Sequence, residues 1–264
     1  MFKTTLIAGI LASASICAVS AADLFVPKTT ADFSKANVTA KEGVYTSKGG
    51  FTLFSTKTFK MDPAKKYKIS ADFKSISGTP GYVYIGFRPL DAKNRWIHPA
   101  SVYCLPKTMT ELAAPAKKGD KAVKVKDAAN WNTRSGHSCI TFNAKEDLSD
   151  LPNFDFTYIT KNGAVKKGDV WEISLKSPLK KDYAAGTKVR QQTASSSFIY
   201  AALRKLAPKG EAKLSGIVSG LYKDTIGFRK FWNGTKTFQV IVMHGSAKND
   251  AVLEIRNIKL EEVK

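Results

Sequence analysis

The residues that could carry acid–base chemistry are scattered along the chain. A glycoside hydrolase needs two carboxylates on either side of the bond it cleaves, and each acid or base must lie within hydrogen-bond reach of its proton. Spacing identifies no such pair, because three of the candidate carboxylates fall in alternating strands, where they face solvent, and the fourth falls in a turn. The candidates are Asp72, Asp91, Glu172 and Glu254.

The histidines and the absence of a nucleophile motif also argue against catalysis. His98, His137 and His244 occur singly, and no nucleophile motif such as G-x-S-x-G accompanies them. We therefore expect no catalytic residue and no cofactor. The enzyme alternative is a polysaccharide lyase acting on an acidic glycan, with Tyr and Arg or His as its working groups.

Aromatic and planar polar residues offer a binding chemistry instead. Sugars have apolar ring faces edged by hydroxyls, so their sites combine aromatic platforms with a few hydrogen-bonding side chains. Tyr82 and Tyr84 project from one face of a strand, and the loop 89–98 lies just beyond it. Trp96 and Trp232 have an alternative role as plugs at the ends of the fold. The predicted ligand-binding residues are Tyr82, Tyr84, Arg88, Arg95, Trp96 and Trp232.

Short alternating runs between turn residues must position these side chains. In 66–74, Tyr67, Ile69, Ala71 and Phe73 alternate with polar residues, which predicts one core face and one solvent face. Many such runs predict an all-β fold, an antiparallel β-sandwich. The other strands predicted for it are 51–54, 82–87, 198–203, 238–243 and 252–260.

The middle of the chain carries a second series of strands. We expect residues 105–192 to form a small β-barrel or β-roll inserted in a loop of the sandwich, which comprises 22–104 and 193–264. Asn162-Gly163 is predicted to be a two-residue hairpin turn, because both residues tolerate positive φ. Trp131 and Trp171 are assigned to the core of the insert. The predicted strands are 122–125, 138–142, 156–160, 170–175 and 186–190.

Two stretches of the outer region carry a resemblance. Thr58-Phe59-Lys60-Met61-Asp62-Pro63 followed by Lys66 to Phe73, and the closing segment Val252 to Leu260, are similar to CenC-type carbohydrate-binding modules. The resemblance covers about 23–103 and 196–264. It implies a jelly-roll sandwich that binds glycans and accompanies polysaccharide-degrading enzymes. The insert resembles, more loosely, short β-barrel inserts of secreted and phage tail proteins.

The resemblance also bears on metal binding. Such modules often carry an acidic residue near the closing strand that helps to hold Ca²⁺, and this chain has Arg256-Asn257 there. An arginine repels a cation and supplies no oxygen ligand, so we expect no metal site.

The N-terminus predicts export. Lys3 precedes an apolar stretch from Thr5 to Val19 and then small residues, which is typical of a signal peptide spanning 1–21. A lipoprotein with Cys17 acylated is the alternative, although Ile16 is a poor neighbour for that processing. The mature protein is expected to be secreted or periplasmic, without a transmembrane segment.

The net charge limits the kinds of partner expected, and the cysteines permit one disulfide. After loss of the signal peptide, 41 basic and 22 acidic residues leave a net charge of +19, and seven of the basic residues are Arg. This balance favours a diffuse basic surface that attracts acidic partners, and nucleic acid is not expected for an exported chain without such a motif. An oxidising compartment permits a disulfide between Cys104 and Cys139.

We therefore predict an exported, non-catalytic protein that binds a poly- or oligosaccharide, possibly an acidic one. The alternative from another class is a structural or adhesive envelope protein that holds partners through its basic surface.

Overall fold

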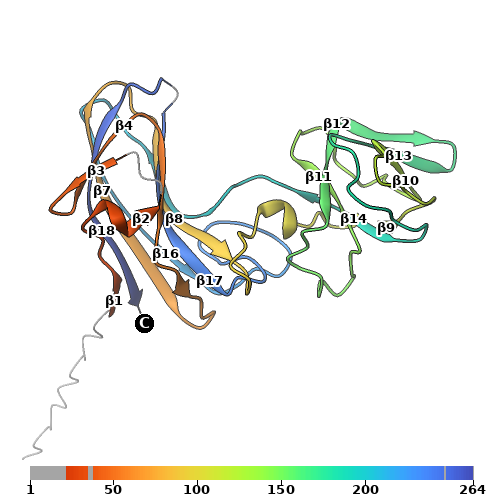
Figure 1. Cartoon of the computed structure of the whole chain (residues 1–264), viewed down its shortest axis with the longest axis horizontal. Helices are drawn as coiled ribbons and strands as arrows, with labels where there is room; N and C mark the ends of the chain where they lie inside the picture. Colours follow the sequence, from red (N-terminus) through yellow and green to blue (C-terminus); the bar gives the residue numbers. More distant parts are fainter. Residues whose placement is uncertain (1–21, 35–37, 247, 264) are drawn as a thin grey trace, which may run out of the picture.

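The computed structural model describes residues 22–34, 38–246 and 248–263, and its regular secondary structure consists almost entirely of antiparallel strands. They form three sheets, two of which pack face to face as a sandwich (Figure 1). This confirms the prediction of an all-β, antiparallel sandwich. The predicted signal peptide lies outside the described residues.

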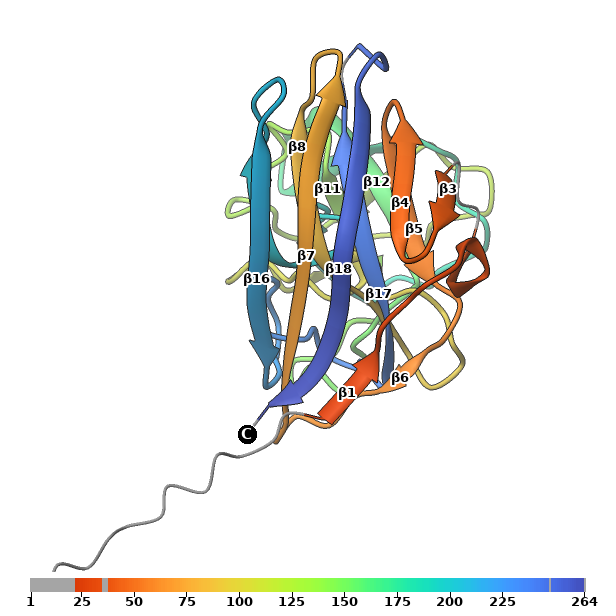
Figure 2. The ribbon, with the colours of Figure 1, turned by 90° about the vertical axis from the view of Figure 1, so that its left-hand side faces the viewer.

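Sheet A is the side of the sandwich shown face-on in Figure 2, in the order β16-β7-β18-β4-β3 with β1 beside β18. Sheet B has the order β15-β8-β17-β5-β2, with β6 beside β17. Sheet A contains β1 (Ala22–Phe25), β3 (Val38–Lys41), β4 (Val44–Lys48), β7 (Lys66–Ser77), β16 (Glu211–Ser219) and β18 (Val252–Val263). Sheet B contains β2 (Phe33–Ser34), β5 (Phe51–Ser55), β6 (Phe59–Lys60), β8 (Tyr82–Leu90), β15 (Ile199–Lys205) and β17 (Thr237–Gly245).

The connection of these strands is that of a jelly roll. Along the chain the eight main strands pass from one sheet to the other at every step except between β8 and β15, which pair within sheet B, and they fall into the orders β4-β18-β7-β16 and β5-β17-β8-β15. The predicted inward residues fill the space between the sheets: Tyr67 and Phe73 are each 2% exposed, and Val83, Ile85 and Phe87 are 0% exposed. Two-residue alternation therefore identified the core face of both β7 and β8.

A third sheet lies in the connection between β8 and β15, on the side of sheet B away from sheet A (Figures 1 and 2). Its order is β10-β13-β12-β11-β14-β9, around a separate apolar core that includes Trp131, with Trp171 packed against it. The sheet curls so that Leu112, just after β9, forms an isolated bridge with Val125 of β10, but it is not a closed barrel. It contains β9 (Thr110–Glu111), β10 (Ala122–Val125), β11 (Ser138–Phe142), β12 (Phe156–Lys167), β13 (Val170–Leu175) and β14 (Lys188–Thr193). The 3₁₀ helices are η1 (Thr30–Asp32) and η2 (Pro99–Ser101).

One turn prediction is wrong. Asn162 and Gly163 lie inside β12, where the register with β13 shifts between Ile159 and Ala164. Asn162 has a φ of 57°, and its amide donates to Thr133 O at 2.7 Å. The pair therefore forms a bulge, and the hairpin turn comes later, at Gly168 with a φ of 61°.

Candidate functional site

An aromatic row crosses the outer face of sheet B. We use this name for Tyr82, Tyr84, Tyr200, Phe198 and Trp96, whose neighbouring rings contact one another in that order. The ring centroids are 6.1 Å apart for Tyr82 and Tyr84, 4.9 Å for Tyr84 and Tyr200, and 6.3 Å for Tyr200 and Phe198. Trp96 stacks on Phe198 at 5.6 Å and 27°. Tyr82 is 44% exposed and the other four are partly exposed, so the row is a platform open to solvent.

Backbone geometry brings the row together. A Cβ atom at Gly86 would lie 2.1 Å from Ile199 O, so the absence of a side chain lets β15 approach β8 closely. Tyr200 lies opposite Gly86, next to a register shift in β15, and its ring reaches Tyr84. Beneath the row, Ile241 points outward by alternation yet is 0% exposed.

The turn after β8 positions Trp96. The Asp91 carboxylate accepts hydrogen bonds from the Lys93 and Arg95 amides at 2.8 Å each and from Arg95 Nε at 2.7 Å. Burial opposes the charge on Asp91, but these hydrogen bonds and Arg95 outweigh it and lower the pKa of the carboxyl. The closed turn returns Trp96 to form a bridge with Leu90. Asp91 therefore has a structural role in holding the loop.

Arg88 lies at the loop end of the row without a counter-ion. Its guanidinium carbon is 4.9 Å from the Phe54 ring centroid and 5.4 Å from that of Trp96. Across the described part of the chain, no carboxylate forms an ion pair with it, and Gln239 Oε1 is 3.5 Å from Nη1. Burial lowers its pKa. Arg88 Nε and Trp96 Nε1 are both buried donors without a protein acceptor. Such unsatisfied groups are uncommon in folded proteins, and an acceptor from water or a ligand is one way to satisfy them.

Two predicted binding residues lie elsewhere. Arg95 pairs with Asp91, and its guanidinium carbon lies 4.1 Å from the Phe154 ring centroid of the insert. Trp232 is 0% exposed and belongs to the sandwich core, so it presents no surface to a ligand. This corrects its placement on the binding face and matches the alternative role of a plug. The loop around it folds inward because Phe231 is equally buried and packs on Phe87 and Phe238.

The aromatic contacts continue onto the insert. The His98 ring lies 5.0 Å from that of Trp96 and stacks on Phe156 at 6.3 Å, and Tyr158 follows at 6.0 Å. Phe154 and Phe156 line a hollow of about 250 Å³ on the insert together with Lys181. Sequence reasoning missed the residues that neighbouring strands and the insert supply. Phe54 and Tyr200 directly follow the buried residues Leu53 and Ile199, so two-residue alternation predicts that their side chains lie on the outer face. The missed aromatic residues are Phe54, Phe198, Tyr200, Phe156 and Tyr158.

Three of the other candidates for acid–base chemistry have hydrogen-bond or ion-pair partners within the fold. Glu172 pairs with Lys167 at 2.7 Å, and the pKa of His98 is lowered by burial while its Nδ1 accepts from the Ala100 amide at 3.2 Å, at the start of η2. His244 is 1% exposed, and its Nε2 accepts from the Gly81 amide at 3.0 Å while Nδ1 lies 3.0 Å from Gly49 O. Because Nε2 is an acceptor, the proton of neutral His244 is on Nδ1. His137 is exposed at the surface of the insert.

The predicted disulfide is contradicted. Cys104 and Cys139 are both free, and both lie opposite Gln192, Cys104 through an isolated bridge on one side and Cys139 through β11 on the other. With Gln192 between them, their Cα atoms are about 10 Å apart at two strand spacings, beyond the reach of a disulfide. Burial raises the pKa of Cys139 to about 12 and also raises that of Cys104, so neither thiol is prepared as a nucleophile.

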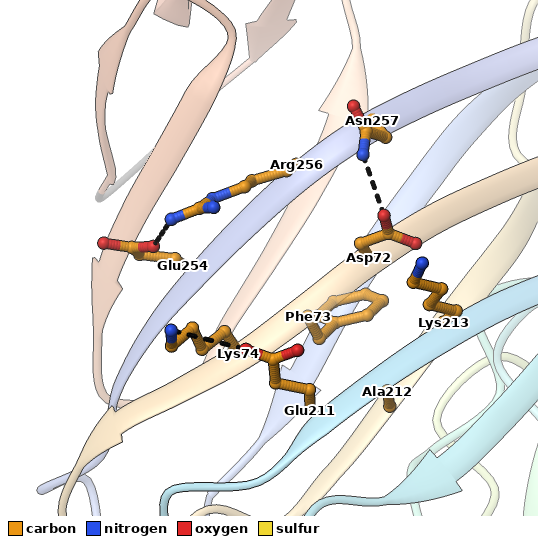
Figure 3. A pocket seen from close by; sticks show the side chains of 9 residues that line it. All are labelled: Asp72, Phe73, Lys74, Glu211, Ala212, Lys213, Glu254, Arg256 and Asn257. Carbon is orange, nitrogen blue, oxygen red and sulfur yellow. Dashed lines mark hydrogen bonds and ion pairs between the residues drawn. The ribbon is translucent and has the colours of Figure 1, made fainter.

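A hollow of about 130 Å³ on sheet A has the opposite chemistry (Figure 3). Most of its polar residues are paired with one another: Asp72 accepts from Asn257 Nδ2 at 2.8 Å, Lys74 and Glu211 are 3.3 Å apart, and Arg256 pairs with Glu254. Within the part of the chain that the structure describes, no group of three His, Cys, Asp or Glu side chains could hold a metal ion. Nor is any described helix long and apolar enough to cross a membrane.

Comparison with known proteins adds little. No protein-family model matches the chain, and no curated protein matches it. A candidate glycosyl hydrolase from Parabacteroides distasonis is 13% identical, with 92% of this chain and 100% of that chain covered and a TM-score of 0.31. The mavirus penton protein is 11% identical, with coverages of 82% and 91% and a TM-score of 0.18. Similarities of this size carry no argument about function.

Proposed function

We propose that this protein is an exported, non-catalytic carbohydrate-binding protein whose aromatic row holds a poly- or oligosaccharide. The observation that carries the proposal is the row itself, in which three tyrosines, a phenylalanine and a tryptophan form one continuous, partly exposed platform. Aromatic faces of this kind stack on the apolar faces of sugar rings, and tyrosine hydroxyls can meet the ring hydroxyls.

Energetics support a binding role for these rings. Partly exposed tyrosine and tryptophan side chains leave apolar area in water, at a cost of roughly 25 cal/mol for each Å². A ligand that covers the row recovers part of this free energy. The jelly-roll strand order is also that implied by the resemblance to CenC-type modules. In this proposal residues 105–192 act as an inserted module that extends the binding face through Phe156 and Tyr158.

The test is affinity electrophoresis and a glycan array on residues 22–264. We expect binding by the wild type and at least about a tenfold loss in the double variant Tyr84→Ala, Trp96→Ala, since hot-spot aromatic truncations cost 2 kcal/mol or more. The matched control is Ile76→Ala, Ile217→Ala, which removes two exposed apolar side chains from sheet A.

Three outcomes contradict the proposal. One is that no glycan binds the wild type. Another is that both double variants lose affinity equally. The third is salt-sensitive association with cell envelopes that ignores free sugars, which would point to the adhesive role instead. New absorbance from unsaturated sugars on adding an acidic polysaccharide would show lyase activity and contradict the non-catalytic part.

A further inference from the structure

The two sheets of the sandwich differ in where their carboxylates lie. No strand of sheet B that the structure describes contains Asp or Glu, whereas the strands of sheet A contain several. Those of sheet A are Asp23, Asp72, Glu211, Glu254, Glu261 and Glu262. The strands of sheet A therefore supply counter-ions for several of its own cations, whereas the strands of sheet B, which carries the aromatic row, supply none.

Ion pairs follow the same division. On sheet A, Lys68 pairs with Glu261 at 3.6 Å, and Lys259 lies 2.8 Å from Asp23 and 2.9 Å from Glu261. On sheet B, Arg88 has no carboxylate partner among the described residues, and the same holds for Lys205. Lys205 is opposite Tyr82 in the ladder, at the far end of the row. The aromatic row is thus flanked at both ends by a cation that lacks a counter-ion.

Of these two cations, Arg88 has the larger free-energy cost of removal from water. It is half-buried between Phe54 and Trp96, and a charge removed from water is unfavourable unless it is paired. The two rings offset part of this cost by cation–π interaction, worth about 0.5–1 kcal/mol at exposed sites. An anion from a ligand would supply the missing partner, and a planar guanidinium fits a carboxylate or sulfate group.

We infer that the aromatic row selects an acidic glycan, whose carboxylate or sulfate groups pair with Arg88 and Lys205 while its rings stack on the tyrosines and Trp96. This inference rests on the proposed function and adds the charge of the ligand to it. Neutral polymers bind through stacking alone and therefore bind more weakly.

The experiment compares a polyuronate with the same polymer after carboxyl reduction to the neutral sugar, and with a sulfated neutral glycan. Isothermal titration calorimetry should show the polyuronate binding at least about tenfold more tightly than its reduced form, with a preference that shrinks as salt is added. The sulfated glycan distinguishes a general anion site from one that fits carboxylates. If it binds as tightly as the polyuronate, Arg88 and Lys205 recognise the charge alone.

Charge variants locate the effect. Arg88→Gln should lose most of the acidic preference, and Lys205→Gln a smaller part, whereas Lys68→Gln removes the same charge from sheet A and should leave the preference intact. Gln239→Glu keeps Arg88 and places a carboxylate near its Nη1, since Gln239 Oε1 is 3.5 Å away. We expect this internal counter-ion to compete with the ligand and to reduce the preference about as much as Arg88→Gln does.

The failures are distinguishable. Equal affinity for the polyuronate and its reduced form overturns the acidic selectivity and leaves glycan binding in place. Equal losses in Arg88→Gln and Lys68→Gln also overturn it, because net charge alone would then explain the effect. Absence of binding to all three polymers and to the glycan array refutes the proposed function itself.

Discussion

Sheet A and sheet B have the same two-residue alternation, yet the side chains on their outward faces differ in chemistry. The face of sheet A presents lysines and carboxylates that neutralise one another, as in the pairs Lys74–Glu211 and Lys68–Glu261. The face of sheet B presents rings and Arg88, with no carboxylate in its strands. Solvent-exposed ion pairs contribute little stability, but on sheet A they give several of the cations a counter-ion within the sheet.

What the two sheets share is the burial of their inner faces. Both inner faces are mainly aliphatic and aromatic, with Ile69 and Val240 each 0% exposed. The outer faces are then free to differ, and the one with incomplete contacts is the one turned toward the insert (Figure 1). Experiments can separate residues that maintain the sandwich from residues that the aromatic row uses.

The largest effect expected is on Trp232, which separates core from face among the tryptophans. Trp232→Ala should lower the free energy of unfolding by about 3–5 kcal/mol, because a large, fully buried side chain leaves a cavity. Trp96→Ala should cost less stability and more glycan affinity. Urea unfolding monitored by circular dichroism gives the stability of each variant, and affinity electrophoresis gives its glycan affinity. A smaller stability loss in Trp232→Ala than in Trp96→Ala would contradict the assignment of Trp232 to the core.

Trp232→Phe refines this test. The indole Nε1 is buried without an acceptor, so its removal relieves an unsatisfied donor. The phenylalanine variant should therefore lose much less stability than the alanine variant, and a loss of equal size would mean that the indole nitrogen has a partner in solution.

The next effect is a pH dependence of stability from His244 on the inner side of sheet B. Burial lowers its pKa below 6.5, so between that value and the lowered one the unfolded chain binds more protons than the folded chain. Stability is then complete above about pH 6.5 and is lost as the pH falls through the lowered pKa. Protonation also removes Nε2 as the acceptor for the Gly81 amide.

His244→Gln should reduce this slope, measured as the change in free energy of unfolding between pH 7.5 and pH 5. His98, whose pKa burial also lowers, contributes to what remains. The control is His137→Gln at an exposed position of the insert, which should keep the wild-type slope. An unchanged slope in His244→Gln would refute the role assigned to the buried imidazole.

Sequence reasoning recovered the strands whose alternation is uninterrupted. β7 and β8 were predicted with their core faces because aromatic and aliphatic residues recur at every second position. β16 was missed, although Ala212, Leu214 and Val218 are buried in it. Gly216 interrupts its pattern, and a Cβ there would lie 2.3 Å from Ala201 O, so packing against β15 requires the glycine. A residue required by tertiary packing thus obscured the local signal.

The candidate site was recoverable only along one strand. Tyr82 and Tyr84 share a face by alternation, which the sequence displays. Tyr200 and Phe198 join them through the pairing of β15 with β8, and that register depends on the approach at Gly86. The predicted disulfide failed for a similar reason, since no local pattern places Gln192 between Cys104 and Cys139. Contacts between distant segments are set by packing, so a single strand cannot reveal them.

The smallest effect expected comes from unpairing a cation on sheet A. Glu254→Gln removes the partner of Arg256 and should change the free energy of unfolding by less than about 1 kcal/mol, since the pair is solvent-exposed. It should also add no affinity for a polyuronate, because no row of rings accompanies Arg256. A gain as large as the loss in Arg88→Gln would show that an unpaired cation is sufficient on either sheet. In that case the aromatic row would not be needed to explain why one face binds an acidic glycan.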